Sequence, residues 1–503
     1  MKKLIVSIIC VIMAAFMLIG CGESTTPLSD VAGNVLSGNG SFAVEKGNYV
    51  YFVNGQEPVT ASNEFGKVQK GALVRVKTSE LANPKTAKIE TVIPKLFISA
   101  SYKTGVYMYG DYVYYATPSN RKDKQSNVLN NQTQFYRFNL KTGKADDYIT
   151  IAEDNTTEYR FIEKDGTVYL AYVMTEEHSE DEHSTESHSH KVLTVYNADT
   201  RKKVMESFKY EEMLMPEDDS SVFYLTKFGY DEVNESNEAY HEIYKYTIGD
   251  TEAKLVLSGS PDSLTLLQGA KFTLIKNTGN YLFYKQSGID TTNSSVKYFA
   301  MPSSDSENPV LLGGSNKYID AVITSGMYVK SLTEIYYMDT TTELGGFAKF
   351  DYTKVNGAVV GDMTNGRTPV CKDVSGYNLQ FVQNDYAYFS NSEGNYYRCG
   401  LNGENYSQIN GVAMKSPSDW YMPRVIGNYF IGSYADTLYG SYVYVIDITN
   451  INDEEAYKEY LEDVVVEDEE HVLALADTRL GIITSADETA FNESVEEKFD
   501  DED

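Results

Sequence analysis

The chain lacks the short motifs that identify most enzymes. It has no Gly-x-Ser-x-Gly nucleophile elbow, no Gly-rich phosphate loop and no Cys-x-x-Cys pair. Its single His-Glu pair, His241-Glu242, is followed by Lys245 where a zinc peptidase motif places a second histidine. These absences exclude the classes of hydrolase, nucleotide-binding enzyme and dithiol oxidoreductase that are identified by such motifs.

Basic residues are scarce, with 43 Lys and Arg against 73 Asp and Glu and a formal net charge of −30. Binding to a polyanion depends on clustered Lys and Arg, so nucleic acid is excluded as a partner. The acid is concentrated near the end of the chain, and residues 485–503 are predicted to form a disordered acidic tail.

The N-terminus carries a secretory signal. Lys2 and Lys3 precede an apolar run over residues 4–19, which is shorter than the roughly 18 to 20 residues of a membrane-spanning helix. Gly20-Cys21 resembles the lipobox of bacterial lipoproteins. That resemblance implies removal of residues 1–20 and a diacylglycerol, with fatty acids such as palmitate, on Cys21. It also implies a cell-membrane location facing the extracytoplasmic side. Residues 21–40 are polar and are predicted to form a flexible tether.

From residue 41 to 484 the chain repeats one theme, an aromatic strand followed by a second strand and a polar turn. The spacing averages about 54 residues, which suits one four-stranded antiparallel blade per repeat. We therefore predict an all-β fold, a single β-propeller domain over 41–484 with eight blades, or seven as the alternative. The aromatic strands begin at Tyr49, Tyr112, Val168, Val222, Tyr281, Ile335, Tyr386 and Tyr429.

The composition of these strands predicts burial on both faces. In Tyr49-Val50-Tyr51-Phe52-Val53, the odd and even positions are both apolar or aromatic, as expected when blades pack against neighbours on either side. With 42 tyrosines in the chain, we expect tyrosine to fill the space between blades. The partner strands are predicted around residues 73–76, 135–140, 193–196, 243–246, 296–299, 347–350, 396–398 and 442–445.

One short helix is predicted near residues 452–464. Asn452 is the expected cap, with Glu455 three residues later as in a capping box. Two further strands are expected at 471–475 and 480–484, which would complete the last blade or pair with the first.

The seventh repeat, from Asp385-Tyr386-Ala387-Tyr388-Phe389 to Asn402-Gly403-Glu404-Asn405, resembles the repeat of the low-density lipoprotein receptor type of β-propeller. The chain is similar to uncharacterised propeller lipoproteins of Clostridia-type bacteria. Tryptophan is missing where the receptor repeat usually has it, and Trp420 is the only one in the chain. The resemblance implies a propeller used for binding, and it carries over no functional residues.

The only tract with metal-ligand character is 176–190, which holds His178, His183, His188 and His190 among carboxylates. Imidazoles beside carboxylates suit Zn²⁺ or Ni²⁺, but the spacing matches no structural zinc motif. The tract is expected to form an insertion loop, either merely solvated or capturing metal weakly. No other cofactor is indicated.

Cys371 and Cys399 are the only cysteines beyond the N-terminal segment, and both are placed in the seventh repeat. They could form a disulfide outside the cell or remain two buried thiols, and sequence alone leaves both readings open.

These observations favour a lipid-anchored, non-catalytic binding or scaffolding propeller, expected to be a monomer. Its ligand would be a protein, peptide or glycan that contacts the loops at one end of the blades. Two alternatives stay open: an enzyme acting on a polysaccharide or peptide in the central funnel, and weak metal capture by the histidine tract.

Overall fold

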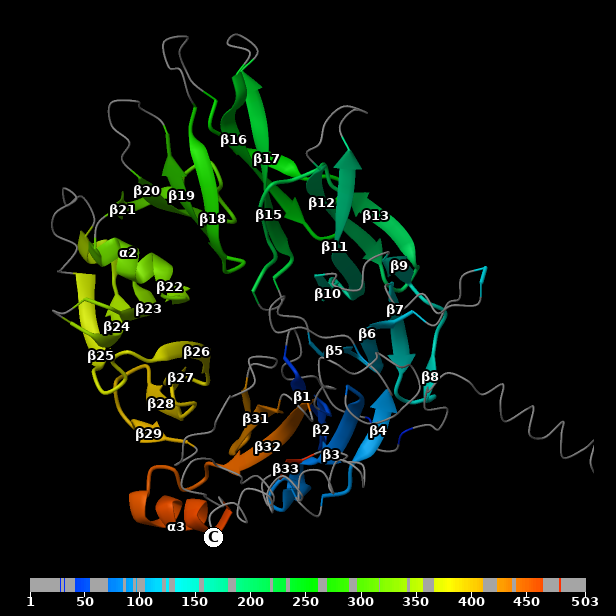
Figure 1. Cartoon of the computed structure of the whole chain (residues 1–503), viewed down its shortest axis with the longest axis vertical. Helices are drawn as coiled ribbons and strands as arrows, with labels where there is room; N and C mark the ends of the chain where they lie inside the picture. Colours follow the sequence, from blue (N-terminus) through cyan, green and yellow to red (C-terminus); the bar gives the residue numbers. More distant parts are fainter. Residues whose placement is uncertain are drawn as a thin grey trace, which may run out of the picture. The chain divides into compact units, whose positions relative to one another are not determined.

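A computed structural model describes the parts of the chain that carry its eight β-sheets. The described residues are 28, 31, 41–54, 71–84, 87–93, 96, 105–119, 124–125, 132–152, 158–179, 187–217, 220–231, 236–260, 269–288, 296–315, 317–341, 344–355, 366–409, 423–436, 440–464 and 479–480. Each sheet is antiparallel with four strands in chain order, and one sheet carries a fifth strand. The fold is an eight-bladed β-propeller, as the repeat predicts (Figure 1).

The chain divides into two compact units, and the first contains Met1–Thr157, Met414–Asn450 and Lys458–Asp503. Numbered in chain order, blades one, two and eight belong to it. One hydrophobic cluster contains residues of all three blades, among them Val50, Val113 and Ile431. The strands are β1 (Ala43–Lys46), β2 (Tyr49–Val53), β3 (Leu73–Lys77) and β4 (Glu90–Ile93) in blade one; β5 (Tyr107–Tyr109), β6 (Tyr112–Pro118), β7 (Thr133–Asn139), β8 (Lys144–Ala145) and the extra β9 (Thr150–Ala152) in blade two; and β30 (Arg424–Ile426), β31 (Tyr429–Asp436), β32 (Gly440–Asp447) and β33 (Arg479–Leu480) in blade eight.

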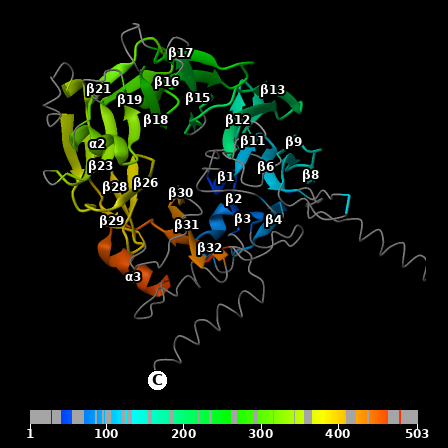
Figure 2. The same ribbon diagram turned by 45° about the horizontal axis from the view of Figure 1, so that its top comes forward.

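The second unit contains Glu158–Ala413 and Ile451–Tyr457 and holds blades three to seven (Figure 2). Its strands are β10 (Tyr159–Lys164), β11 (Thr167–Ser179), β12 (Ser187–Asn197) and β13 (Lys202–Glu206); β14 (Met213–Leu214), β15 (Val222–Asp231), β16 (Ser236–Thr247) and β17 (Lys254–Ser258); β18 (Lys271–Asn277), β19 (Tyr281–Ser287), β20 (Lys297–Pro302) and β21 (Val310–Gly314); β22 (Tyr328–Ser331), β23 (Glu334–Asp339), β24 (Gly346–Phe350) and β25 (Arg367–Cys371); and β26 (Asn378–Gln383), β27 (Tyr386–Ser390), β28 (Tyr396–Gly400) and β29 (Ser407–Gln408).

The two strands predicted in every repeat are the second and third strands of each blade. All five residues of β2 are buried, which confirms that both faces of the aromatic strands are covered. Tyrosine fills the core as expected, and the largest fully buried side chains include Tyr51, Tyr224 and Tyr337. Strand β33 pairs with β32 through Leu480 and Val443, so the last predicted segment completes blade eight. The segment 471–475 lies outside the described residues.

Tight turns join the first and second strands of several blades. Asp165 and Gly166 both have positive φ, 52° and 77°, between β10 and β11. Asn384 and Asp385, at 53° and 60°, make the same kind of connection between β26 and β27. Two-residue loops with positive φ match the right-handed twist of paired strands, so these residue types fix the hairpin register.

Two α-helices occur in the described part of the chain, where the sequence predicted one. Helix α3 (Glu454–Val464) confirms the prediction, but its cap is Asp453, whose side chain accepts a hydrogen bond from the Ala456 backbone amide at 3.2 Å. Asn452, the expected cap, instead accepts a hydrogen bond from Arg398 at 3.0 Å. Neither helix is long and apolar enough to cross a membrane, a finding that covers only the described residues.

The unpredicted helix is α2 (Lys317–Thr324), which lies between β21 and β22. Its Ile319 and Val322 are buried in a cluster with Ile335 of β23. Eight residues give only two turns of apolar periodicity, which is too short a pattern to stand out among strands. Two short 3-10 helices, η1 (Thr78–Glu80) and η3 (Tyr352–Val355), follow β3 and β24.

Blade six contains a buried ion pair. The Arg367 guanidinium lies 2.9 Å from the Asp339 carboxylate, and the two side chains are 4% and 0% exposed. Asp339 also accepts hydrogen bonds from the Tyr337 hydroxyl and the Thr341 backbone amide, each at 2.7 Å. Burial opposes the charged carboxylate, but the hydrogen bonds from Thr341 and Tyr337 and the charge of Arg367 outweigh it and lower the pKa of Asp339.

Candidate functional site: a polar pocket around Tyr210

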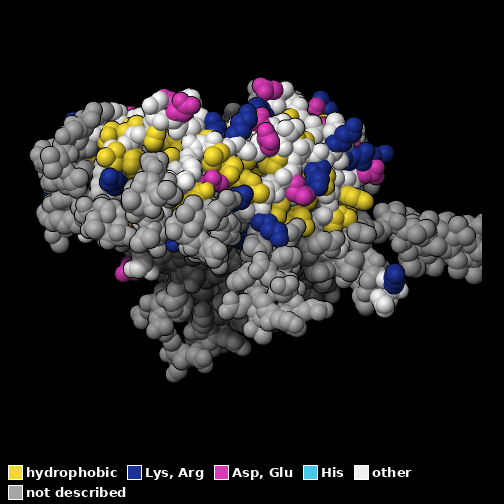
Figure 3. Space-filling model, turned by 90° about the horizontal axis from the view of Figure 1, so that it is seen from above, with side chains coloured by type: hydrophobic (Ala, Val, Ile, Leu, Met, Phe, Trp, Pro, Cys, Tyr) yellow, Lys and Arg dark blue, Asp and Glu magenta, His cyan; other side chains and the backbone are white. Residues whose placement is uncertain are grey.

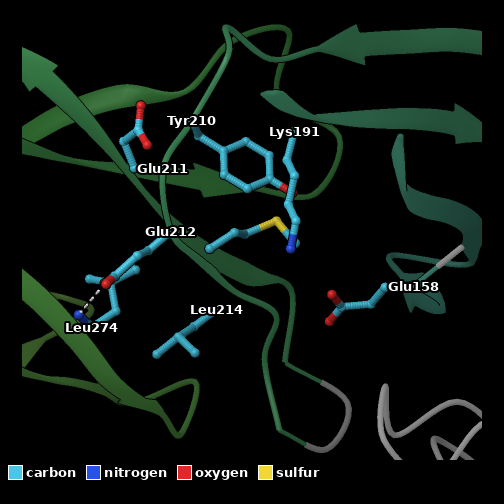
Figure 4. A pocket seen from close by; sticks show the side chains of 8 residues that line it. Glu158, Lys191, Tyr210, Glu211, Glu212, Leu214 and Leu274 are labelled. Carbon is cyan, nitrogen blue, oxygen red and sulfur yellow. Dashed lines mark hydrogen bonds between the residues drawn. The ribbon is translucent and has the colours of Figure 1, made fainter. Parts of the chain in front are cut away.

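A pocket of about 280 Å³ lies within the second unit, where residues of blades three, four and five meet (Figure 4). Glu158 precedes β10, and Lys191 lies in β12. The link between blades three and four contributes Tyr210, Glu211 and Glu212. The walls are completed by Met213 and Leu214 of β14 and Leu274 of β18.

Backbone hydrogen bonds attach this link to both blades that it joins. The Tyr210 amide donates to the Lys191 carbonyl at 3.1 Å, and the two residues form an isolated antiparallel bridge. On the other side, the Thr226 amide of β15 donates to the Glu212 carbonyl at 2.8 Å, and the Glu212 amide donates to the Thr226 hydroxyl at 2.9 Å. The link is therefore positioned by two sheets, which fixes the side chains it presents.

Tyr210 is the most unusual side chain of the pocket. It is 3% exposed and packs in a hydrophobic cluster with Val195 and Phe223. Among the described residues, its buried hydroxyl has no hydrogen-bond partner. Burial, with a further contribution from the Glu158 charge, raises the pKa of Tyr210, so the hydroxyl stays protonated and is a donor at neutral pH.

The charged side chains of the pocket fall into two groups. Figure 4 shows Lys191 and Glu158 on one side of the Tyr210 ring and Glu212 on the other. Glu212 accepts a hydrogen bond from the Leu274 backbone amide at 2.9 Å. Lys191 is exposed, and in the described part of the chain its ammonium forms no ion pair. The pocket therefore offers a hydroxyl and an ammonium as donors close to one carboxylate, with a second carboxylate across the cavity.

The lining suits binding better than nucleophilic catalysis. The eight described residues around the cavity include no serine, threonine, cysteine or histidine, so no nucleophile and base pair is assembled there. The face of the described residues in Figure 3 is not uniformly acidic despite the net charge of the chain. Lys and Arg side chains lie among Asp and Glu there, with hydrophobic side chains between them.

The structure corrects the expectation that the whole histidine tract is a loop. His178 lies in β11, and His188 and His190 lie in β12, because both strands extend beyond their predicted ends. Their register pairs His178 with His188 and Glu176 with His190. His183 lies outside the described residues. Metal binding by these histidines stays a prediction.

The two cysteines lie in neighbouring blades. Cys371 ends β25 of blade six, whereas Cys399 lies in β28 of blade seven, so they are not neighbours within one sheet as the repeat boundaries suggested. Both are buried free thiols in one hydrophobic cluster. The Cys399 thiol donates to the Gly400 carbonyl at 3.4 Å. The nearby Cys399 thiol lowers the pKa of Cys371 to about 7, and Cys371 together with burial raises the pKa of Cys399. Cys21, the predicted lipidation site, lies outside the described residues.

Sequence reasoning did not single out the pocket residues. Tyr210 is one of 42 tyrosines, and Glu211 and Glu212 are two of 73 acidic residues, so composition could not separate them from the rest. The one usable signal was position, because they lie in a link between blades rather than in a strand.

Comparisons with known proteins leave the family open. No family model matches the sequence, and no curated protein matches it. Among solved structures, the chain is similar to the computationally designed Ika8 protein, with a TM-score of 0.38 and 8% identity over 84% of this chain and 100% of that one.

Two peptidases are similar at the same level. An acylaminoacyl peptidase of Pyrococcus horikoshii has a TM-score of 0.37 and 12% identity, over 80% of this chain and 49% of the peptidase. A puromycin-hydrolyzing peptidase of Mycobacterium tuberculosis has a TM-score of 0.35 and 10% identity, over 86% of this chain and 55% of the peptidase. The chain spans about half the length of each peptidase, and at these TM-scores the likeness carries no argument about function.

Proposed function

We propose that the protein is a non-catalytic binding module on the extracytoplasmic face of the cell membrane, held there by a lipid on Cys21. The observation that carries the proposal is the buried Tyr210 hydroxyl, which has no partner among the described residues at the wall of a polar pocket. A hydroxyl buried without a hydrogen bond costs about 1–3 kcal/mol in proteins. A ligand that supplies the missing acceptor recovers this free energy, which supports a binding role.

The rigidity of the pocket adds support. Its link is hydrogen-bonded to β12 and β15, so little conformational entropy remains to be lost when a ligand docks. Loops fixed on a β-sheet frame are the usual place for recognition in propellers and other rigid folds. The cavity of about 280 Å³ lies at the small end of ligand sites, which favours a small molecule or the end of a longer one.

A ligand screen tests this function. The full chain, purified from membranes in detergent, is heated with amino acids, amines, sugars and short peptides in parallel with a Tyr210→Phe variant. We expect at least one compound to raise the melting temperature of the wild type and to leave the variant unchanged. If every active compound stabilises both proteins equally, the pocket is not the binding site.

Anchoring has its own test, because it does not depend on the pocket. In a Cys21→Ser variant no diacylglycerol can be attached, so the protein should move from the membrane fraction to the soluble fraction. Retention of the variant in the membrane fraction would contradict lipid anchoring.

The enzyme alternative differs in what happens to the ligand. Three carboxylates line the pocket, those of Glu158, Glu211 and Glu212, and one oxygen of Glu212 already accepts a hydrogen bond from the Leu274 amide. After prolonged incubation we expect mass spectrometry to recover the bound compound intact. A product that forms with the wild type, and not with Tyr210→Phe, would favour catalysis over binding.

Metal capture is a second candidate function, favoured by the register of the β11–β12 hairpin. The ladder sets position 178 opposite 188 and position 176 opposite 190. The register therefore brings three histidines and one glutamate to neighbouring positions of the ladder. Such a set has the nitrogen and oxygen donors that Zn²⁺ or Ni²⁺ prefers.

Calorimetry with Zn²⁺ separates this candidate from a solvated hairpin. His178→Ala should lower the binding heat, whereas the control His241→Ala should keep it, because His241 lies in β16 of the next blade. The heat should fade at acidic pH as the imidazoles become protonated. Equal heats for both variants would remove the candidate.

A further inference from the structure

We propose that the Tyr210 pocket recognises a small zwitterion, an α-amino acid with free ammonium and carboxylate groups and an aliphatic side chain. This inference rests on the proposed binding function and specifies the chemistry of its ligand.

The donors define where the ligand carboxylate binds. The Tyr210 hydroxyl is protonated and has no acceptor among the described residues. Lys191 lies directly beside it, because the two residues form an antiparallel bridge and bridged residues carry their side chains on the same side. A hydroxyl and an ammonium side by side match the two oxygens of a carboxylate, and hydrogen bonds to a charged acceptor are the stronger kind.

The ligand ammonium is assigned to Glu158. The Glu158 charge contributes to the raised pKa of Tyr210, which places this carboxylate near the hydroxyl. Figure 4 shows Glu158 on the Lys191 side of the ring and directed toward the cavity. In an α-amino acid, the ammonium and carboxylate groups are both attached to the same α-carbon. A donor pair with an adjacent acceptor therefore fits that headgroup better than it fits a lone anion or a lone amine.

The remaining wall suits an aliphatic side chain. Met213 and Leu214 line the pocket, and Figure 4 shows Leu214 between Glu212 and Glu158, with Leu274 beside Glu212. Burial of apolar surface on these residues would add affinity at roughly 25 cal/mol per Å². The cavity of about 280 Å³ limits the ligand to one residue or a short peptide end.

The charge balance argues against simpler ligands. Three glutamates and one lysine line the cavity, so an anion without an ammonium group would face net negative charge. An amine without a carboxylate would leave the Tyr210 hydroxyl without an acceptor. A ligand that leaves a buried polar group of its site without a hydrogen bond binds much more weakly than a ligand that pairs with it.

The test compares L-leucine with two analogues by isothermal titration calorimetry at pH 7 on the purified full chain. L-leucinamide lacks the carboxylate, and N-acetyl-L-leucine lacks the ammonium group. We expect one leucine to bind per chain, with each analogue weaker by about tenfold to a hundredfold, the loss that follows from one missing charged hydrogen bond.

Variants identify the residues responsible. Tyr210→Phe, Lys191→Met and Glu158→Gln should each weaken leucine binding by about tenfold or more. Tyr352→Phe is the matched control, because the Tyr352 hydroxyl donates to the Leu311 carbonyl in another part of the unit and should leave binding unchanged.

The outcomes distinguish this inference from the function on which it rests. If either analogue binds as tightly as leucine, or if Tyr210→Phe binds leucine normally, the zwitterion inference fails. If leucine does not bind while the screen finds another compound that depends on Tyr210, the inference fails and the binding function stands. If no compound distinguishes wild type from Tyr210→Phe, both fail.

Discussion

Replacing Tyr210 with phenylalanine should stabilise the fold while it removes ligand binding. The substitution deletes one hydroxyl that is buried and has no partner among the described residues, and it keeps the ring that packs with Val195 and Phe223. An unpaired buried hydroxyl costs about 1–3 kcal/mol, and part of that cost is returned as the site relaxes. We therefore expect the free energy of unfolding to rise by about 1 kcal/mol.

The matched comparison is Tyr337→Phe. The Tyr337 hydroxyl donates to the Asp339 carboxylate at 2.7 Å and is fully buried, so its removal leaves a charged acceptor short of a donor. That loss should lower the free energy of unfolding by about 1.5–3 kcal/mol. The two substitutions are chemically identical, and the opposite signs follow only from the hydrogen bonds.

Urea unfolding followed by circular dichroism gives both values, provided that the slopes of the transitions agree between variants. A Tyr210→Phe protein that is less stable than wild type by 1 kcal/mol or more would show that the hydroxyl is paired in solution. That result would refute the reasoning that makes Tyr210 a ligand contact.

Three further predictions concern other parts of the chain. Asp339→Asn should lower the free energy of unfolding at pH 7 by about 3 kcal/mol, because it leaves Arg367 buried without its counter-charge. The folded pKa of Asp339 lies below its ordinary value of 3.8, so the stability from its ionised form is present above about pH 4 and is lost as pH falls through the folded pKa. The urea midpoints of variant and wild type should therefore converge in acid. Oxidised glutathione should join Cys371 and Cys399 in a disulfide, which mass spectrometry detects as the loss of two hydrogen atoms. The reaction should become faster as pH rises through about 7, because the Cys371 thiolate is the attacking group. An unchanged mass at pH 8 would contradict the proximity of the two thiols. Asp453→Ala should lower the free energy of unfolding by about 1 kcal/mol, measured by urea unfolding, because helix α3 loses its N-terminal cap. An unchanged free energy would mean that another group caps the helix.

The repeat was predictable because its signal is strong and local. Strand β2 is buried on both faces, and such burial requires aromatic and aliphatic residues at both odd and even positions, as in Tyr49–Val53. The eightfold recurrence favoured eight blades and left seven as the alternative, and the structure has eight. Apart from the segment that contains β33, the first and fourth strands were not predicted individually. Some of them are too short to show a periodicity, since β14 and β29 are only two residues long.

The pocket was not predictable from the same signals. The pocket depends on the Tyr210 hydroxyl, which has no hydrogen-bond partner among the described residues. Whether a hydroxyl is paired depends on three-dimensional packing, which composition and spacing do not reveal. The position of Cys371 shows the same limit on a smaller scale. Its sequence distance from Cys399 placed both in one repeat, whereas the strand pairing assigns Cys371 to the end of blade six.

A crystal structure of the full chain with L-leucine tests the central claim most directly. The account predicts density for one leucine in the pocket, with a carboxylate oxygen at about 2.7 Å from the Tyr210 hydroxyl and the ammonium group beside Glu158. A pocket that holds only solvent at saturating leucine, with the Tyr210 hydroxyl bonded to another protein group, would contradict it.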